Sequence, residues 1–221
     1  MNLDLLLASE IVGTCAAVIV LLGVMLVATR SIGRSIWLVG AQSVFVGLTA
    51  VTVGLATGAD HLIVGGLLAI GAKGIVVPLV LGSILRRSSV RRERHLLLDV
   101  RVLLVVAVVI VFASATAAAD VSASVGVAAS RVLPAAISQV LMGLLIVMTR
   151  RKALSLVVGL LVFENGIALT AFALSYGMPL VVELGILFDV LIAVVVAWIY
   201  ARRMLDVFGS TSTDRLRSLR G

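Results

Sequence analysis

Residues 148–175 read MTRRKALSLVVGLLVFENGIALTAFALS, a short basic cluster followed by an apolar run whose single charged residue is Glu164. A helix that crosses a bilayer needs roughly 17 to 25 mainly apolar residues, and the run at 153–175 is long enough. Inside a bilayer the backbone must satisfy its own hydrogen bonds, so this run is predicted to be a transmembrane helix.

The rest of the chain repeats this plan. It is 62% hydrophobic and 13% charged, with a mean hydropathy of +1.25. A soluble domain of this size would need a more polar exterior. We therefore predict an all-α, polytopic integral membrane protein with about seven transmembrane helices, near residues 5–28, 36–56, 62–85, 102–119, 133–149, 153–175 and 179–201. The fifth run is the shortest, and the Ser/Ala-rich stretch 121–131 is predicted either to extend it or to be loop or interfacial turn.

The distribution of basic residues predicts the orientation of the helices in the membrane. All Lys and Arg residues except Lys73 and Arg131 fall in alternate loops, at the start of the fourth run or in the tail. This pattern predicts an N-terminus outside and a C-terminus in the cytoplasm, in a multi-pass protein of the cell (inner) membrane. It also accounts for a pI near 11.0 without nucleic-acid binding. The first run has no basic segment before it, so we expect it to be retained rather than cleaved.

Small residues and one proline indicate how helices meet. Gly40, Gly47 and Gly54 recur every seven residues in the second run, a spacing that lets two helix backbones approach closely. Pro78 lies inside the third run, where it removes a backbone donor and predicts a kink a little over one turn after Lys73.

Among the charged residues inside predicted helices, four are the main candidates for function: Lys73, Glu164, Glu183 and Asp189. A charge at the bilayer centre costs about 2.5–3.5 kcal/mol on insertion scales, so such residues are candidates for function. Lys73, Glu164 and Asp189 fall near the middle of their runs, whereas Glu183 falls nearer the outer surface. One lysine cannot neutralise several acids, which favours groups that take up and release protons, and we predict a proton path. The alternative is a static ion pair of Lys73 with Glu164 or Asp189.

Three other polar residues are possible supports of this path. Asn165 can hold Glu164 or a water molecule, Glu10 lies in the outer part of the first helix, and Gln42 is expected to bond between helices. With one cysteine, Cys15, and two isolated histidines, we predict no metal site, no cofactor and no catalytic residue.

Three motifs carry a family resemblance. KGIVVPLVL (73–81), FENGIALTA (163–171) and PLVVELGILFDVLIAVVV (179–196) resemble the hydrogenase-4 membrane component E family. The resemblance implies a non-catalytic membrane-arm subunit of a complex-I-like, energy-converting [NiFe] hydrogenase or formate hydrogenlyase-type complex. It also implies antiporter-like membrane chains and a peripheral [NiFe] hydrogenase module as partners, with the metal chemistry in those other chains.

The last three predicted helices are similar to the NuoK subunit of respiratory complex I and to the MrpC antiporter subunit. This resemblance implies a four-helix membrane region at 1–132, a NuoK-like three-helix region at 133–201 and a cytoplasmic tail at 202–221. The NuoK-type acid follows a Gly-Leu pair directly, whereas here Gly159 and Leu160 precede Glu164 by about one helical turn. Two alternatives stay open: a stand-alone secondary cation transporter or MrpC-like antiporter subunit, and a scaffold whose charges serve only packing.

Overall fold

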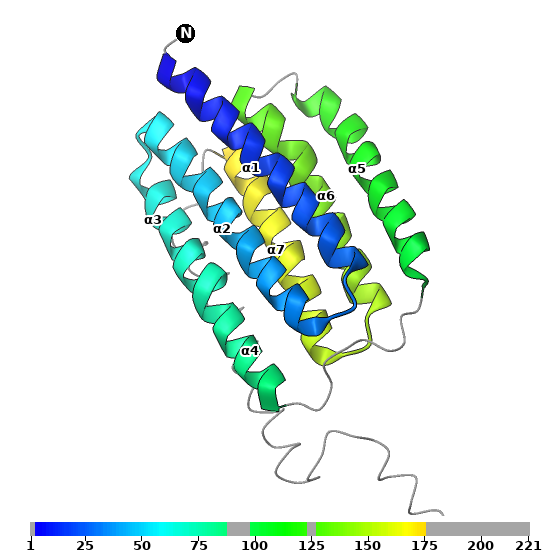
Figure 1. Cartoon of the computed structure of the whole chain (residues 1–221). Helices are drawn as coiled ribbons and strands as arrows, with labels where there is room; N and C mark the ends of the chain where they lie inside the picture. Colours follow the sequence, from blue (N-terminus) through cyan, green and yellow to red (C-terminus); the bar gives the residue numbers. More distant parts are fainter. Residues whose placement is uncertain (1–2, 88–97, 123–126, 176–221) are drawn as a thin grey trace, which may run out of the picture.

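The computed structural model describes residues 3–87, 98–122 and 127–175, which form a bundle of long helices (Figure 1). The helices are α1 (Leu3–Ala28), α2 (Ile32–Thr57), α3 (Asp60–Ala69), the π-helix η1 (Ile70–Val76), α4 (Val77–Arg87), α5 (Val100–Ser122), α6 (Val127–Thr149) and α7 (Ala153–Ser175). The predicted all-α fold is confirmed for this part of the chain.

Six helical stretches of the described residues are long and apolar enough to cross a membrane, with α3, η1 and α4 counted together as one stretch. They correspond to the first six predicted spans. The seventh predicted span, at 179–201, and the predicted tail lie outside the described residues. Membrane orientation stays a prediction.

The stretch between the fourth and fifth predicted spans is largely helical, in agreement with its interpretation as an extension of the fifth run. Helix α5 runs on to Ser122, and α6 begins at Val127 rather than at residue 133, so much of 121–131 is helical rather than loop. Pro134 lies inside α6. Proline is tolerated in membrane helices when neighbouring groups compensate for its missing donor, so it did not end the helix here.

Helix α7 lies between α2 and α6 in the described bundle. It packs against α6 and α2, while α1 packs against α2 and α6 on another side (Figure 1). Helix α5 packs on α6 and α1, and α3, η1 and α4 follow one another along α2. Residues of α7 therefore face several neighbours within a few positions of one another.

Glycines set the closest approaches, as predicted for α2. A Cβ atom added at Gly47 would lie 2.6 Å from the carbonyl oxygen of Gly66 on α3, and one at Gly40 would lie 2.5 Å from Cγ of Pro78 on α4. Only a residue without a side chain fits at these two points. The same holds on the other side of the bundle, where a Cβ at Gly166 of α7 would lie 2.9 Å from the carbonyl oxygen of Ala136 on α6.

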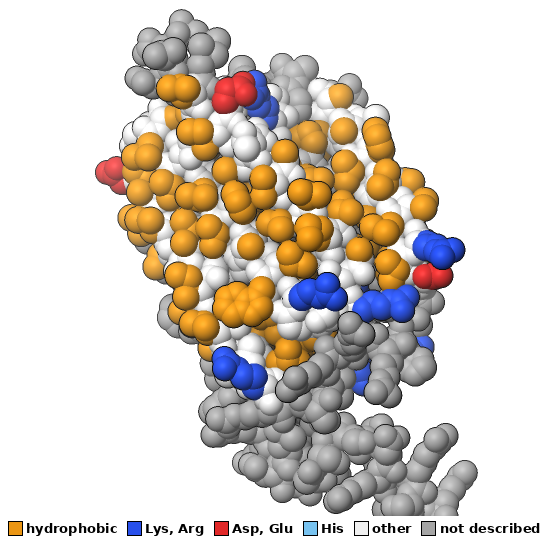
Figure 2. Space-filling model, viewed as in Figure 1, with side chains coloured by type: hydrophobic (Ala, Val, Ile, Leu, Met, Phe, Trp, Pro, Cys, Tyr) orange, Lys and Arg blue, Asp and Glu red, His pale blue; other side chains and the backbone are white. Residues whose placement is uncertain are grey.

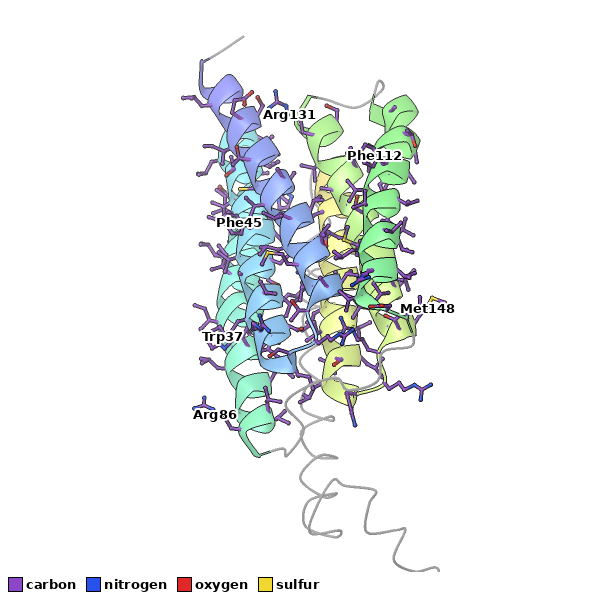
Figure 3. All side chains as sticks on the ribbon, turned by 45° about the vertical axis from the view of Figure 1, so that its right-hand side comes forward. Trp37, Phe45, Arg86, Phe112, Arg131 and Met148 are labelled. Atoms are coloured by element: carbon purple, nitrogen blue, oxygen red, sulfur yellow. The ribbon has the colours of Figure 1, made fainter. Side chains whose placement is uncertain are left out.

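On the visible surface, charged side chains lie mainly toward the two ends of the bundle (Figure 2). Figure 2 shows an apolar band across the visible face, with Lys and Arg side chains gathered mainly toward one end. Trp37 and Arg86 lie at that end, and Arg131 lies at the other (Figure 3). Trp37 is 59% exposed, and Phe112 on α5 is 70% exposed, which suits contact with lipid in a membrane protein. This distribution agrees with a bundle that crosses a bilayer.

Candidate functional site

Lys73 lies on a π-helical segment between two ordinary α-helices. The backbone N–H of Val77 donates to the carbonyl of Ala72, five residues earlier, so the turn that contains Lys73 is wider than an α-helical turn. Pro78 follows directly and has no N–H to give to the carbonyl of Gly74. The irregularity that Pro78 predicts therefore takes the form of a π-helix that carries the lysine.

Lys73 and Glu164 form a buried ion pair. The Nζ atom of Lys73 donates to Oε1 of Glu164 at 2.5 Å, and the two side chains are only 8% and 7% exposed. The pair joins η1 to α7, two segments far apart in the sequence. Their contact places the two residues at the same level of the bundle, while their predicted depth in the bilayer stays a prediction.

A cluster of uncharged polar side chains lies beside the pair. This polar cluster comprises four buried residues from three helices, Gln42 and Ser43 on α2, Gln139 on α6 and Asn165 on α7. The side-chain amide of Gln42 donates to Oε1 of Gln139 at 2.6 Å, and both glutamines donate to the backbone carbonyl of Ile19 on α1, at 3.2 and 3.1 Å. Four helices thus meet in one hydrogen-bonded layer.

Asn165 connects α7 to this layer. Its Nδ2 atom donates to Oγ of Ser43 at 3.1 Å and to Oε1 of Gln42 at 3.2 Å. The hydroxyl of Ser43 lies 3.3 Å from Oδ1 of Asn165 and 3.0 Å from the carbonyl oxygen of Val39, so its single proton has two acceptors. Buried polar groups cost free energy unless they are hydrogen-bonded, and the cluster meets that requirement through contacts between helices.

The polar layer separates two apolar clusters. On α2 it lies between Val39 and Val46, and on α6 it lies between Met142 and Ala136. On α7, Glu164 and Asn165 lie between Val162 on one side and Leu169 on the other. The polar groups therefore form one continuous level inside an otherwise apolar interior.

The structure separates the predicted site residues into three groups. Lys73 and Glu164 meet, and Gln42 forms the predicted contact between helices. Glu10 does not join them, because its carboxylate pairs at 2.9 Å with Arg131, near the end of the bundle. The two remaining predicted residues, Glu183 and Asp189, lie outside the described residues.

Asn165 was expected to hold either Glu164 or a water molecule. In the structure its side chain donates to Gln42 and Ser43 on α2. Adjacent residues on a helix point about 100° apart, so the two side chains face different neighbours. Asn165 supports the site through α2 rather than by direct contact with the acid.

Sequence reasoning missed Gln139, Ser43 and Arg150. Gln139 carries a signal similar to that of Gln42, an amide in the middle of an apolar run, but its partner on another helix could not be identified. Arg150 resembled a solvated loop residue. Its guanidinium is buried and donates to the carbonyls of Val27 and Leu26 in the last turn of α1, at 2.8 and 3.4 Å. The carbonyl of Leu26 also accepts from the backbone N–H of Thr29.

The site is suited to acid–base chemistry of a single proton. A carboxylate that faces an ammonium group is stabilised as an anion, and it becomes a proton acceptor when the ammonium moves away. Among the described residues, no group of three His, Cys, Asp or Glu side chains is placed to hold a metal ion.

Similarity to known proteins covers part of the chain. Over 88 residues it is 47% identical to an uncharacterized protein of Mycobacterium tuberculosis (strain ATCC 25618 / H37Rv), and this segment is 40% of each chain. Over 89 residues it is 33% identical to hydrogenase-4 component E of Escherichia coli (strain K12), which is 40% of this chain and 41% of that protein. The values for hydrogenase-4 component E of Shigella flexneri are the same.

The matched segment thus spans about two fifths of the length of these curated relatives. No protein-family model and no solved structure matches the chain. The similarity of residues 133–201 to NuoK and MrpC stays a prediction. Partial similarity to hydrogenase-4 component E, together with six apolar helices, supports a relationship to a family of hydrogenase membrane subunits.

Proposed function

We propose that this chain is a non-catalytic membrane-arm subunit of a complex-I-like, energy-converting [NiFe] hydrogenase or formate hydrogenlyase-type complex. In this proposal Lys73 and Glu164 form part of a lateral proton path. The observation that carries it is the buried Lys73–Glu164 pair, held at 2.5 Å among helices apolar enough to cross a membrane. Similarity to hydrogenase-4 component E supports the kind of complex.

The chemistry of the pair fits a relay step. While Lys73 faces Glu164, each charge stabilises the other, and the carboxylate stays ionised. If a neighbouring charge draws the lysine away, Glu164 remains as an isolated buried anion, which is costly and favours uptake of a proton. Return of the ammonium then favours release of that proton. Asp189 and Glu183 are proposed to continue the path beyond the pair.

The proposed setting follows from the same reasoning. The chain would lie in the cell (inner) membrane, with the basic end of the bundle toward the cytoplasm. Its partners would be antiporter-like membrane chains and a peripheral [NiFe] hydrogenase module. This chain would bind no cofactor itself, and the redox chemistry would belong to the peripheral module.

Two experiments test the proposal at separate levels. Affinity purification of the tagged chain from detergent-solubilised membranes should bring down a nickel-iron large subunit and antiporter-like chains. Recovery of the chain without any such subunit would contradict the proposed complex. In membrane vesicles, E164Q should leave hydrogen oxidation or evolution measurable but reduce the proton gradient, whereas the control E10Q, at the Glu10–Arg131 pair, should not.

One observation favours a second function, that of a scaffold. The Lys73–Glu164 pair is already closed, and tight glycine contacts surround it, as expected for a static structural pair. A scaffold would keep normal gradient formation in the E164Q variant. The same vesicle measurement therefore distinguishes the two functions.

A further inference from the structure

Three consecutive residues of α7 point toward three different neighbours. Glu164 reaches Lys73 on η1, and Asn165 reaches Gln42 and Ser43 on α2. Gly166 lies against α6, where a Cβ atom would approach the backbone nitrogen of Val140 to 2.5 Å. Each residue of an α-helix turns by about 100°, so the direction of any one of the three determines the other two.

Close contacts of Gly159 and Gly166 with α6 favour one rotation of α7, and its large apolar residues add little to that choice. Its sequence ALSLVVGLLVFENGIALTAFALS is apolar on every side, and Val, Leu and Ile can exchange places at little cost in a lipid-like interior. Polar side chains that must find partners make this rotation more specific, as a single buried asparagine does for the register of a coiled coil. Asn165 is placed to do this for α7.

Hydrogen bonds of Gln139 fix the positions of α6 and α1 in the same layer. Its amide accepts from Gln42 and donates to the carbonyl of Ile19, so α2, α6 and α1 are fixed to one another at this level. Gly23 on α1 provides the space, since a Cβ atom there would lie 2.6 Å from both Oε1 and Nε2 of Gln139. Asn165 thus bonds to Gln42, which is itself linked through Gln139 and the carbonyl of Ile19 to α6 and α1.

We propose that the polar cluster is a positioning device, which sets the rotation of α7 and thereby directs Glu164 at Lys73. Asn165 is the positioning residue on α7, and Gln139 holds Gln42, to which Asn165 bonds. The inference deepens the proposed function, because it concerns the same pair. The inference can be tested through the reactivity of the Glu164 carboxyl group, which can be measured without any hydrogenase partner.

The test uses dicyclohexylcarbodiimide, an apolar reagent that attaches to protonated carboxyl groups inside membranes. The full chain in phospholipid vesicles is labelled, and the adduct on the peptide that contains Glu164 is quantified by mass spectrometry. In the unchanged chain the paired carboxylate should label weakly. K73Q, which removes the partner, should give strong labelling and defines the upper limit.

Variants of the cluster should move the labelling toward that limit. N165L and Q139L each remove contacts between helices, and we expect labelling to rise about three- to tenfold, as the loss of a membrane hydrogen bond would allow. S138A is the matched control, because Ser138 neighbours Gln139 but, within the described part of the chain, its hydroxyl bonds only to the carbonyl of Pro134 in its own helix. It should label like the unchanged chain.

A combined variant separates positioning from general loosening. If Gln139 acts through the ion pair, K73Q/Q139L should label no more than K73Q alone. Labelling well above that of K73Q would show general loosening and would overturn the proposal, as would wild-type labelling in N165L and Q139L. If those two variants do not fold, S43A decides: it loses only a hydroxyl, and unchanged labelling in S43A would also overturn the proposal.

The cluster and the relay can fail independently. Normal gradient formation in E164Q vesicles would reject the relay and leave the labelling results valid. Unchanged labelling would reject the positioning role and leave the relay untouched.

Discussion

Lys73 of η1 and Glu164 of α7 are 91 residues apart in the sequence, yet their side chains meet at 2.5 Å inside the bundle. Beside this contact, Asn165 turns away from its charged neighbour and bonds to α2. The charged and the uncharged polar groups inside the bundle therefore have different partners. The charged groups neutralise each other across η1 and α7, and the uncharged groups fix the helices that hold them.

The first prediction concerns the stability of the ion pair. K73Q or E164Q alone leaves one charge buried without its partner, and loss of one member of a buried pair costs roughly 3–5 kcal/mol. K73Q/E164Q removes both charges and should cost clearly less than the two single changes added together. Thermal unfolding in detergent micelles, arranged as a double-mutant cycle, measures this difference.

The exposed Glu10–Arg131 pair provides the control for that cycle. The side chain of Glu10 is 70% exposed, and surface pairs contribute only about 0–1 kcal/mol. E10Q should therefore change the unfolding temperature little. Additive costs for K73Q and E164Q would show that the two residues do not interact in the membrane protein.

The second prediction concerns the contact between α2 and α3. G47A places a methyl group 2.6 Å from the carbonyl oxygen of Gly66, so the helices must separate. Overpacking of this kind costs about 1–3 kcal/mol. G82A is matched to it, because a Cβ at Gly82 meets nothing within 4 Å, and it should be neutral or slightly stabilising. Equal unfolding temperatures for G47A and G82A would contradict the close approach.

The third prediction concerns Arg150. R150Q should destabilise the protein by about 1.5–3 kcal/mol, because charge-assisted bonds from the buried guanidinium satisfy carbonyls at the end of α1. The next residue, Arg151, is exposed and serves as the control. Yield and unfolding temperature should fall in R150Q and stay near normal in R151Q. An equal effect of both changes would indicate that only the total positive charge matters.

Much of the fold could be predicted because a bilayer restricts the possible structures. Each apolar run had to be a helix, and the glycine spacing of α2 indicated which face approaches a neighbour. Depth could also be counted along a helix, which placed Lys73 and Glu164 at one level. These predictions depend on local sequence and on membrane thickness, and both are independent of tertiary contacts.

The partners of the polar side chains could not be predicted in the same way. Gln42 was expected to bond to another helix, but whether it meets Gln139 or a different amide depends on how α2, α1 and α6 are arranged. The π-helix at Lys73 depends on packing against α2 as well as on Pro78. Arg150 lies in a basic turn that looks solvated, and only the position of the α1 carboxyl end shows why it is buried.

The last prediction separates a relay from a static pair by reversing the charges. K73E/E164K keeps one acid and one base at this site, so a large part of the stability lost in either single variant should return. A scaffold needs nothing more, and it would show normal gradient formation in vesicles. A relay that uses Glu164 together with the proposed acids Glu183 and Asp189 needs an acid at position 164, whereas the reversed pair moves the acid to position 73. We therefore expect K73E/E164K to regain thermal stability while its proton gradient stays as low as that of E164Q. Recovery of both properties would show that the pair serves only to hold η1 against α7.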